Sequence, residues 1–92
     1  MQDDEFEWDD DKAESNFRKH EVSFETARLA FDDPNWIDVD EPDPDEGRYK
    51  RTCMHEGRLY VVLYVERGSR TRIISARRAN RHEQDIYFDQ SA

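Results

Sequence analysis

The stretch Arg58–Arg78, RLYVVLYVERGSRTRIISARR, determines how this chain folds. It begins with a continuous run of apolar and aromatic residues, passes through Gly68-Ser69, and continues into a second segment that contains β-branched residues. A two-residue loop that contains glycine between two such segments is typical of a tight β-hairpin. The stretch therefore predicts two antiparallel strands, Arg58–Arg67 and Arg70 to about Arg77.

The turn also determines which residues of the hairpin share a face. If Gly68-Ser69 is the whole loop, residues whose numbers sum to 137 face each other. One face then carries Tyr60, Val62, Tyr64 and Glu66 together with Thr71, Ile73, Ser75 and Arg77. The other carries Leu59, Val61, Leu63 and Val65 together with Arg72, Ile74 and Ala76. Because the second face is the more apolar, we expect it to pack against helices and the mixed first face to line a cleft.

Segments on either side of the hairpin extend the sheet and add a helix. Arg48–His55 has the composition of a third strand, joined to the hairpin by a turn at Glu56-Gly57, and Trp36–Asp40 alternates like an edge strand. After the hairpin, Asn80 is followed three residues later by Glu83. This spacing is that of a capping box, which predicts a C-terminal helix.

The N-terminal part of the sequence predicts helices. Phe6-Glu7-Trp8 is a short extended segment, and the carboxylates of Asp9-Asp10-Asp11 suit the N-terminus of a helix that continues to about His20. Ser23 is a good N-cap for a second helix, Phe24–Phe31, which carries several apolar side chains.

The order of these elements predicts the fold class. A chain of 92 residues can bury one small core, so we expect residues 1–92 to form a single domain. Helices come first, strands follow, and a last helix ends the chain, which is typical of α+β proteins. We expect two N-terminal helices, an antiparallel sheet of three to five strands and one C-terminal helix.

Charge is distributed unevenly along this chain, whose formal net charge is −9. Residues 1–47 hold 4 basic and 18 acidic side chains, whereas residues 48–82 hold 10 basic and 2 acidic ones. Arginine, the commonest of these cations, binds phosphate bidentately through its planar guanidinium group. Clustered arginines with interleaved tyrosines are typical of surfaces for single-stranded RNA. The acidic remainder also fits adaptation to high salt.

The acidic segment Glu41–Gly47 superficially suggests a calcium site. No register of it places both a Gly at the sixth position and a Glu at the twelfth, as an EF-hand loop requires, so we expect neither a metal nor a cofactor. The single Cys53 can form no internal disulfide, and the sequence contains neither a signal-peptide pattern nor a long apolar span. These features predict a soluble, cytoplasmic protein without membrane contact.

Several short motifs occur together between Phe6 and Tyr87. They are Phe6-Glu7-Trp8-Asp9, Lys12, Asn16, Lys19-His20, Val22, Phe24, Ala27, Arg48-Tyr49, Gly57-Arg58-Leu59, Glu66-Arg67-Gly68, Arg72 to Ala79, Arg81 and Glu83. This set resembles the BrnT toxin family, and its C-terminal part is the more specific. Asp10 stands where a Pro commonly starts the first helix of that family, and Glu21 where a Gly commonly follows the Lys-His pair.

The resemblance implies a function and partners. It implies a ribonuclease toxin of a type II toxin-antitoxin system with a RelE-like fold, which cleaves RNA and thereby inhibits translation and growth. It also implies a BrnA-like ribbon-helix-helix antitoxin. The antitoxin dimer would block and bridge the toxins in a hetero-oligomer and would bind operator DNA.

A ribonuclease that uses no metal must make the RNA 2′-OH attack its own phosphate, stabilise the extra negative charge and protonate the leaving 5′ oxygen. Arginines can supply the second requirement. We expect Arg72, Arg77 and Arg78 to hold or stabilise phosphate, with Arg48 and Arg67 as neighbouring clamps. Each well-placed donor of this kind contributes about 3–4 kcal/mol to catalysis.

Other residues of the sequence are also candidates for the site, and most of them have more than one interpretation. Glu66 is a general base or an arginine-orienting carboxylate, or else half of a cross-strand ion pair, and Arg81 is a further RNA contact. His20 is a possible acid or base, although histidines more often lie at surfaces and caps. Tyr64 could stack on a base, donate a proton or simply pack in the core. The competing class for the whole chain is a non-catalytic module whose basic sheet binds an antitoxin partner or nucleic acid.

Overall fold

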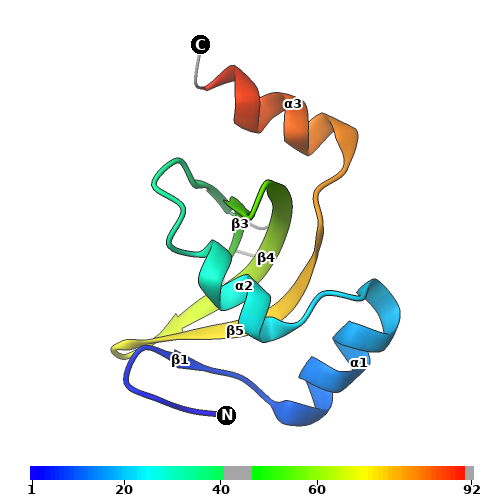
Figure 1. The fold of residues 1–92 in the computed structure, drawn as a ribbon. Coiled ribbons are helices and arrows are strands. Elements are labelled where there is room, and N and C mark those ends of the chain that lie inside the picture. Colours follow the sequence, from blue (N-terminus) through cyan, green and yellow to red (C-terminus); the bar gives the residue numbers. More distant parts are fainter. Residues whose placement is uncertain (41–46, 91–92) are drawn as a thin grey trace.

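The computed structural model describes residues 1–40 and 47–90 and confirms the α+β class (Figure 1). In the described ranges it contains three helices, two before the main strands and one after them. The elements are β1 (Phe6–Glu7), α1 (Asp10–His20), α2 (Phe24–Ala30), β2 (Ile37–Asp40), β3 (Arg48–His55), β4 (Arg58–Arg67), β5 (Arg70–Arg78) and α3 (Arg81–Asp89). The rejected calcium loop falls mostly on residues 41–46, outside the described residues.

The strands form one five-stranded sheet in the order β1-β5-β4-β3-β2. Neighbours pair antiparallel except β1, which lies parallel to β5 and makes the sheet mixed. The turn between β3 and β4 places Glu56 at φ 50° and Gly57 at φ 79°, and Gly68 opens the β4–β5 turn at φ 61°. These left-handed conformations are typical of two-residue hairpin loops, so both predicted turns are confirmed.

A β-bulge changes the predicted register of the β4–β5 hairpin. From Arg67↔Arg70 to Tyr64↔Ile73 the paired numbers sum to 137 as predicted, but the register shifts between Leu63 and Tyr64. Beyond the shift, Leu63 faces Ser75. The prediction that Ser75 and Arg77 share a face with Tyr60, Val62 and Tyr64 is therefore wrong, because one extra residue moves every later side chain of the strand to the other face.

The face that α1 and α2 cover is also opposite to the predicted one. Phe24, Ala27 and Ala30 are fully buried in one cluster with Val62 and Ala76. Tyr60, Tyr64 and Ile73 are buried as well, at 7%, 2% and 2% exposure. Large rings and β-branched chains bury more apolar area than the neighbouring Leu and Val face could, which favours this side as the core.

Asn16 connects α1 to the sheet through side-chain hydrogen bonds. Its side-chain amide donates to the carbonyls of Val22 (3.0 Å) and Ala76 (2.8 Å), and its oxygen accepts from the Ala76 N–H (3.1 Å). These bonds satisfy backbone groups of β5 where β1 no longer pairs with it. Glu21 ends the helix at φ 58°, with its N–H bonded to the Phe17 carbonyl, so the left-handed helix end forms without the usual glycine.

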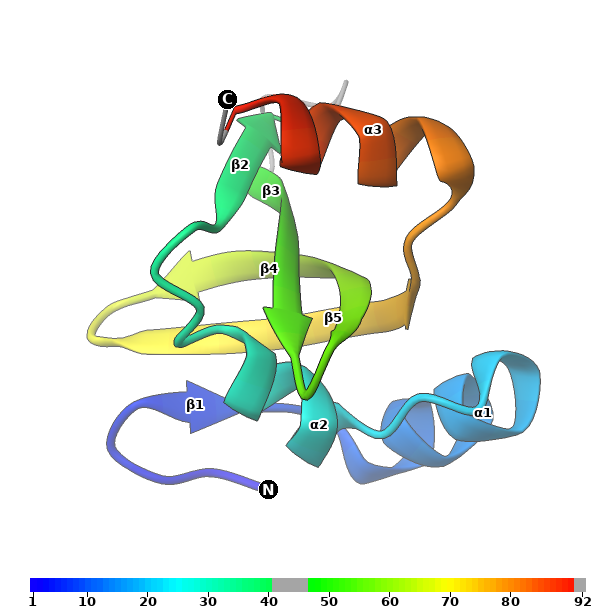
Figure 2. The ribbon, with the colours of Figure 1, turned by 45° about the horizontal axis from the view of Figure 1, so that its top comes forward.

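Helix α3 covers one end of the opposite face (Figure 2). Asn80 and Glu83 form the predicted capping box. Tyr87 is buried with Leu59 and Val61, and its hydroxyl donates to Asp33 at 2.6 Å. In the described part of the chain no helix is long and apolar enough to cross a membrane.

Candidate functional site

The sheet face opposite α1 and α2 is open beyond α3. It carries cations on both sides of β4, whose residues on this face are apolar. Three rows of directly opposed residues cross it: Arg48, Val65 and Arg72; Lys50, Leu63 and Ser75; Thr52, Val61 and Arg77. We call these nine positions the open face, within which Val61 is 3% exposed because it packs with Tyr87 of α3. In each row the β4 residue is apolar, and every cation comes from β3 or β5. An apolar floor flanked by cations suits a ligand with negatively charged groups at its edges.

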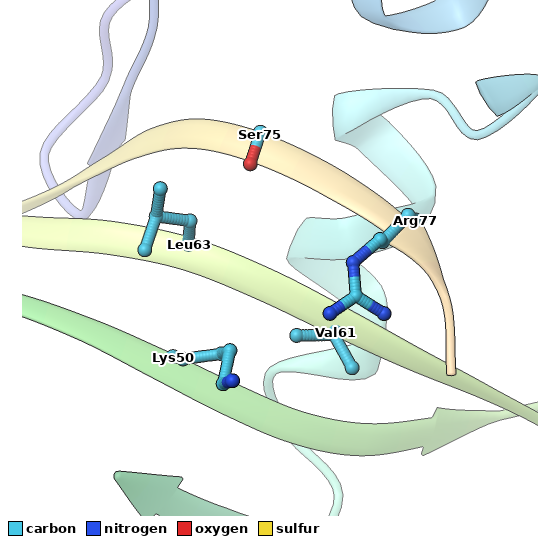
Figure 3. A pocket seen from close by; sticks show the side chains of 5 residues that line it. All are labelled: Lys50, Val61, Leu63, Ser75 and Arg77. Carbon is cyan, nitrogen blue, oxygen red and sulfur yellow. The ribbon is translucent and has the colours of Figure 1, made fainter. Parts of the chain in front are cut away.

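Lys50 and Arg77 define the centre of the open face. With Val61, Leu63 and Ser75 they line a hollow of about 290 Å³. Figure 3 shows the Arg77 side chain extending from β5 over β4 to Val61, while Lys50 lies on β3 at the other side of the hollow. A neighbouring hollow of about 380 Å³ is also lined by Lys50 and Arg77, and it extends to His82 and Glu83 of α3. The two hollows therefore form one site bounded by α3.

Carboxylates hold two arginines of this face in place. Glu83 accepts two bonds from Arg77, at 2.7 and 2.8 Å, and Glu7 accepts one from Arg72 at 2.6 Å. Both carboxylates are largely buried, with 12% and 13% of their side chains exposed. The bonds from Arg77 hold the pKa of Glu83 below its usual value. These arginines are therefore oriented by charged partners, and part of their positive charge is offset.

Arg78 lies on the other side of the sheet from Arg77, its neighbour in sequence. It lines a hollow of about 290 Å³ together with His20, Arg58 and Tyr60. The three arginines that we expected to hold or stabilise phosphate, Arg72, Arg77 and Arg78, are thus divided between two faces, because successive strand residues point to opposite sides. His20 and Arg78 do come together, although away from the open face.

Two other predicted residues, Tyr64 and Glu66, lie away from the open face. Tyr64 is 2% exposed, and its hydroxyl donates to Asp38, which also accepts from Arg51, so of its interpretations packing fits. Burial raises the pKa of the Tyr64 hydroxyl. Glu66 is exposed opposite Thr71 near the hairpin tip and makes no ion pair with any residue that the structure describes.

Two further predicted arginines lie at the margins of the site. Arg67 is mostly exposed, with a guanidinium nitrogen 3.9 Å from Glu7. Arg81 on α3 is 89% exposed at its side chain and pairs with Asp85 one turn later, at 3.3 Å. An exposed pair of this kind contributes little to stability. Both side chains remain accessible to a large ligand.

Sequence reasoning did not find several residues of the site. Lys50 is absent from the predicted set because its place opposite Leu63 depends on the β3–β4 register. Glu7 and Glu83 were not assigned as arginine partners, since each meets its arginine only in the folded chain. One signal was available for Glu83: the capping-box spacing places it at the start of α3, close to the end of β5.

No metal-binding arrangement of three or more His, Cys, Asp or Glu side chains occurs among residues 1–40 and 47–90. Cys53 is fully buried in the main core, and burial raises the pKa of its thiol to about 12. Its sulfur therefore stays protonated and unreactive at neutral pH.

Fold and site together define a small α+β protein with a cationic, partly apolar sheet face suited to a polyanion. A family model described as "Ribonuclease toxin, BrnT, of type II toxin-antitoxin system" matches residues 8–83. The chain belongs to this family, which confirms the resemblance seen in its motifs. The family is one of ribonuclease toxins, which implies an RNA substrate and an antitoxin partner. No curated protein matches the chain.

Proposed function

We propose that this protein is a metal-independent endoribonuclease toxin whose scissile phosphate binds on the open face. The observation that carries the proposal is the hollow that Lys50 and Arg77 line from opposite sides of the apolar Val61 and Leu63. A phosphate between them would receive charge-assisted bonds from two directions, and a base or ribose could lie on the apolar floor. Arg48 and Arg72 lie one row apart from Lys50 and Ser75, and in this proposal they would hold the next phosphate.

The reaction that these groups suit is internal transfer at phosphorus. The 2′ oxygen bonds to phosphorus and loses its proton to a base, while the bond to the 5′ oxygen breaks and that oxygen takes up a proton. The products are a 2′,3′-cyclic phosphate and a free 5′-OH. Arg77 and Lys50 stabilise the charge that builds up on the phosphate, and Glu83 keeps the Arg77 guanidinium in position beforehand.

Proton transfer falls to a histidine in this proposal. His82 lines the hollow that Lys50 and Arg77 also line, whereas Glu66 and His20 lie elsewhere. An imidazole ring has one nitrogen that can donate a proton and one that can accept it, as acid-base catalysis requires. We therefore assign the acid or base role to His82 instead of the two residues favoured by sequence.

The biological setting follows from the family. We propose that cleavage of cytoplasmic RNA inhibits translation and growth, and that a BrnA-like ribbon-helix-helix antitoxin relieves it. A dimer of that antitoxin would bridge two toxins and bind operator DNA. An antitoxin that covers the open face would block phosphate binding directly.

The decisive experiment incubates the purified protein with RNA in the presence of a chelator. We expect products that end in 2′,3′-cyclic phosphate and a large loss of cleavage in Arg77→Gln. Lys12→Gln, on the exposed side of α1, is the matched control for loss of one cation. Binding without cleavage, or cleavage that requires a divalent metal, would overturn the proposal; the former result would favour the non-catalytic module.

A further inference from the structure

A second cationic site lies at the end of the sheet where β3 turns into β4. Two hollows meet there, one of about 290 Å³ that reaches His20 and Tyr60, and one of about 100 Å³ that reaches Phe88 of α3. Arg58 and Arg78 line both. We call the two hollows together the sheet-end groove. Because they share these residues, they form one continuous surface from α1 to α3.

The guanidinium groups of this groove are more available than those of the open face. Arg58 and Arg78 are both exposed, and neither forms an ion pair with a carboxylate in the described ranges. By contrast, Arg72 and Arg77 are bound to carboxylates that are mostly buried. Among the residues that the structure describes, Glu21 is the one acid that lines the two hollows of the groove. The groove thus carries a net positive charge on a strongly acidic protein.

Aromatic rings accompany these cations. Phe88 is 54% exposed although it is large and apolar, and it lines the groove beside Arg58 and Arg78. At the other end the Arg78 guanidinium lies 5.9 Å from the centre of the Tyr60 ring, which supports its orientation. Guanidinium groups next to an exposed ring match the alternation of phosphate and base in a single strand.

The groove is also connected to the open face. Arg77 and Arg78 are consecutive, about 3.8 Å apart at their Cα atoms, and point to opposite sides of the last strand. Arg77 lines the hollows of the open face, and Arg78 lines those of the groove. One extended strand of RNA could therefore contact both as it passes the end of β5.

We propose that the sheet-end groove is a second phosphate-binding subsite, which holds the single-stranded RNA that flanks the segment on the open face. Arg58 and Arg78 bind two successive phosphates, His20 adds a donor, and Phe88 stacks on a base. The assignment rests on the proposed function in one respect, that RNA is the ligand. The sheet-end groove sets the affinity for longer RNA, whereas the chemical step takes place on the open face.

The test measures binding of a 2′-O-methyl RNA of about 12 nucleotides, a length within the range that such surfaces bind, by fluorescence anisotropy at several salt concentrations. This RNA cannot form the cyclic product, so binding is measured whether or not the protein cleaves RNA. In the double variant Arg58→Gln, Arg78→Gln we expect affinity to fall at least about tenfold. The slope of log K against log salt should decrease by about 1.4, since each phosphate contact to a single strand contributes about 0.7.

The matched control is Lys12→Gln, Arg18→Gln, which removes the same charge from exposed positions of α1. A salt slope equal to that of this control would overturn the proposal. On the wild-type protein, RNA should shift the backbone amide NMR signals of Gly57, Arg58 and Arg78, and unchanged signals would also overturn it. This second measurement holds even if the double variant fails to fold.

Cleavage kinetics distinguish this inference from the proposed function. The double variant should raise KM and leave kcat within about twofold, as expected when only uniform binding is lost. A reduced kcat with unchanged KM would place these arginines in the reaction itself and overturn the subsite. If the wild type binds as expected but cuts no RNA, the proposed function fails while the subsite stands.

Discussion

The two faces of the sheet are built from alternate residues of the same strands, yet they have different properties. The face under α1 and α2 buries Val62, Ile73 and Ala76 almost completely. The open face keeps Leu63 and Val65 half-buried beneath a set of cations. The comparison shows that a helix layer on one side turns an alternating pattern into a core, while the same pattern on the uncovered side leaves an accessible, cationic surface.

The two faces also differ in what their arginines contact. On the covered face Arg51 donates two hydrogen bonds to Asp38, at 2.7 and 3.0 Å, and its guanidinium group lies over the ring of Phe31. The positive charge of Arg51 is therefore balanced within the protein. On the open face Glu83 orients Arg77 beside a hollow that a ligand could fill. A count of arginines in the sequence cannot separate these two roles.

The largest expected effect tests the covered face. Phe24→Ala should lower the free energy of unfolding by about 3–5 kcal/mol, because Phe24 is 0% exposed and its loss leaves a cavity. Leu63→Ala on the open face should cost less, since this residue is only partly buried. Chemical denaturation of both variants measures the contrast. Equal losses would show that the open face is packed in solution.

The next effect tests the open face. Arg77→Ala should reduce the rate of RNA cleavage by about 10²–10³-fold, the effect of removing one transition-state donor. Its effect on stability should be smaller than that of Phe24→Ala, because Arg77 is 37% exposed at its side chain. Single-turnover kinetics measure the cleavage rate, and thermal unfolding measures the stability. A variant that cleaves RNA at the wild-type rate would remove Arg77 from the site.

Asn16 tests the connection between helix and sheet. Asn16→Ala should destabilise the fold by about 2–3 kcal/mol, because the buried N–H and C=O of Ala76 lose their partner. Asn16→Asp should also destabilise it, since a carboxylate cannot donate to the two carbonyls. Urea unfolding would reveal this loss, and a neutral Asn16→Asp variant would contradict the hydrogen-bond assignment.

The pH dependence of stability tests the Arg77–Glu83 pair. The pKa of Glu83 is lowered by Arg77, so the pair stabilises the fold above the unfolded-state pKa near 4.5. That stability should disappear as the pH falls through the lower folded-state pKa. Glu83→Gln should therefore flatten the stability curve in this acidic range, and Glu66→Gln, at an exposed position, is the matched control. Parallel curves for wild type and Glu83→Gln would rule the pair out as a source of stability.

The smallest effect concerns Glu21. A residue with a side chain at φ 58° is strained by about 1–2 kcal/mol, and glycine is not. After allowance for the greater unfolded-state freedom of glycine, Glu21→Gly should raise stability by about 0.5–1 kcal/mol. Thermal unfolding would measure it. A destabilised variant would show that the Glu21 side chain makes a favourable contact.

Many of the elements could be predicted from sequence because their signals are local. Asp9 and Ser23 cap their helices as expected, and both hairpin loops form at the predicted glycines. The positions of Ser75 and Arg77 were predicted wrongly because the bulge at the centre of the hairpin leaves no clear mark in the sequence. A single extra residue there moved both side chains to the open face. The side that forms the core was predicted wrongly because Tyr60 and Tyr64 are buried under the helices.

The sequence by itself determined the elements, their order, the family and the concentration of arginine in the second half of the chain. Only the tertiary structure decided which arginines meet a hollow, which are held by Glu7 and Glu83, and which lie at the sheet end with His20. The physical reason is the sequence distance between interacting residues, since turns and caps depend on only a few neighbouring residues. Ion pairs such as Arg72 with Glu7 depend on strand register across the whole chain.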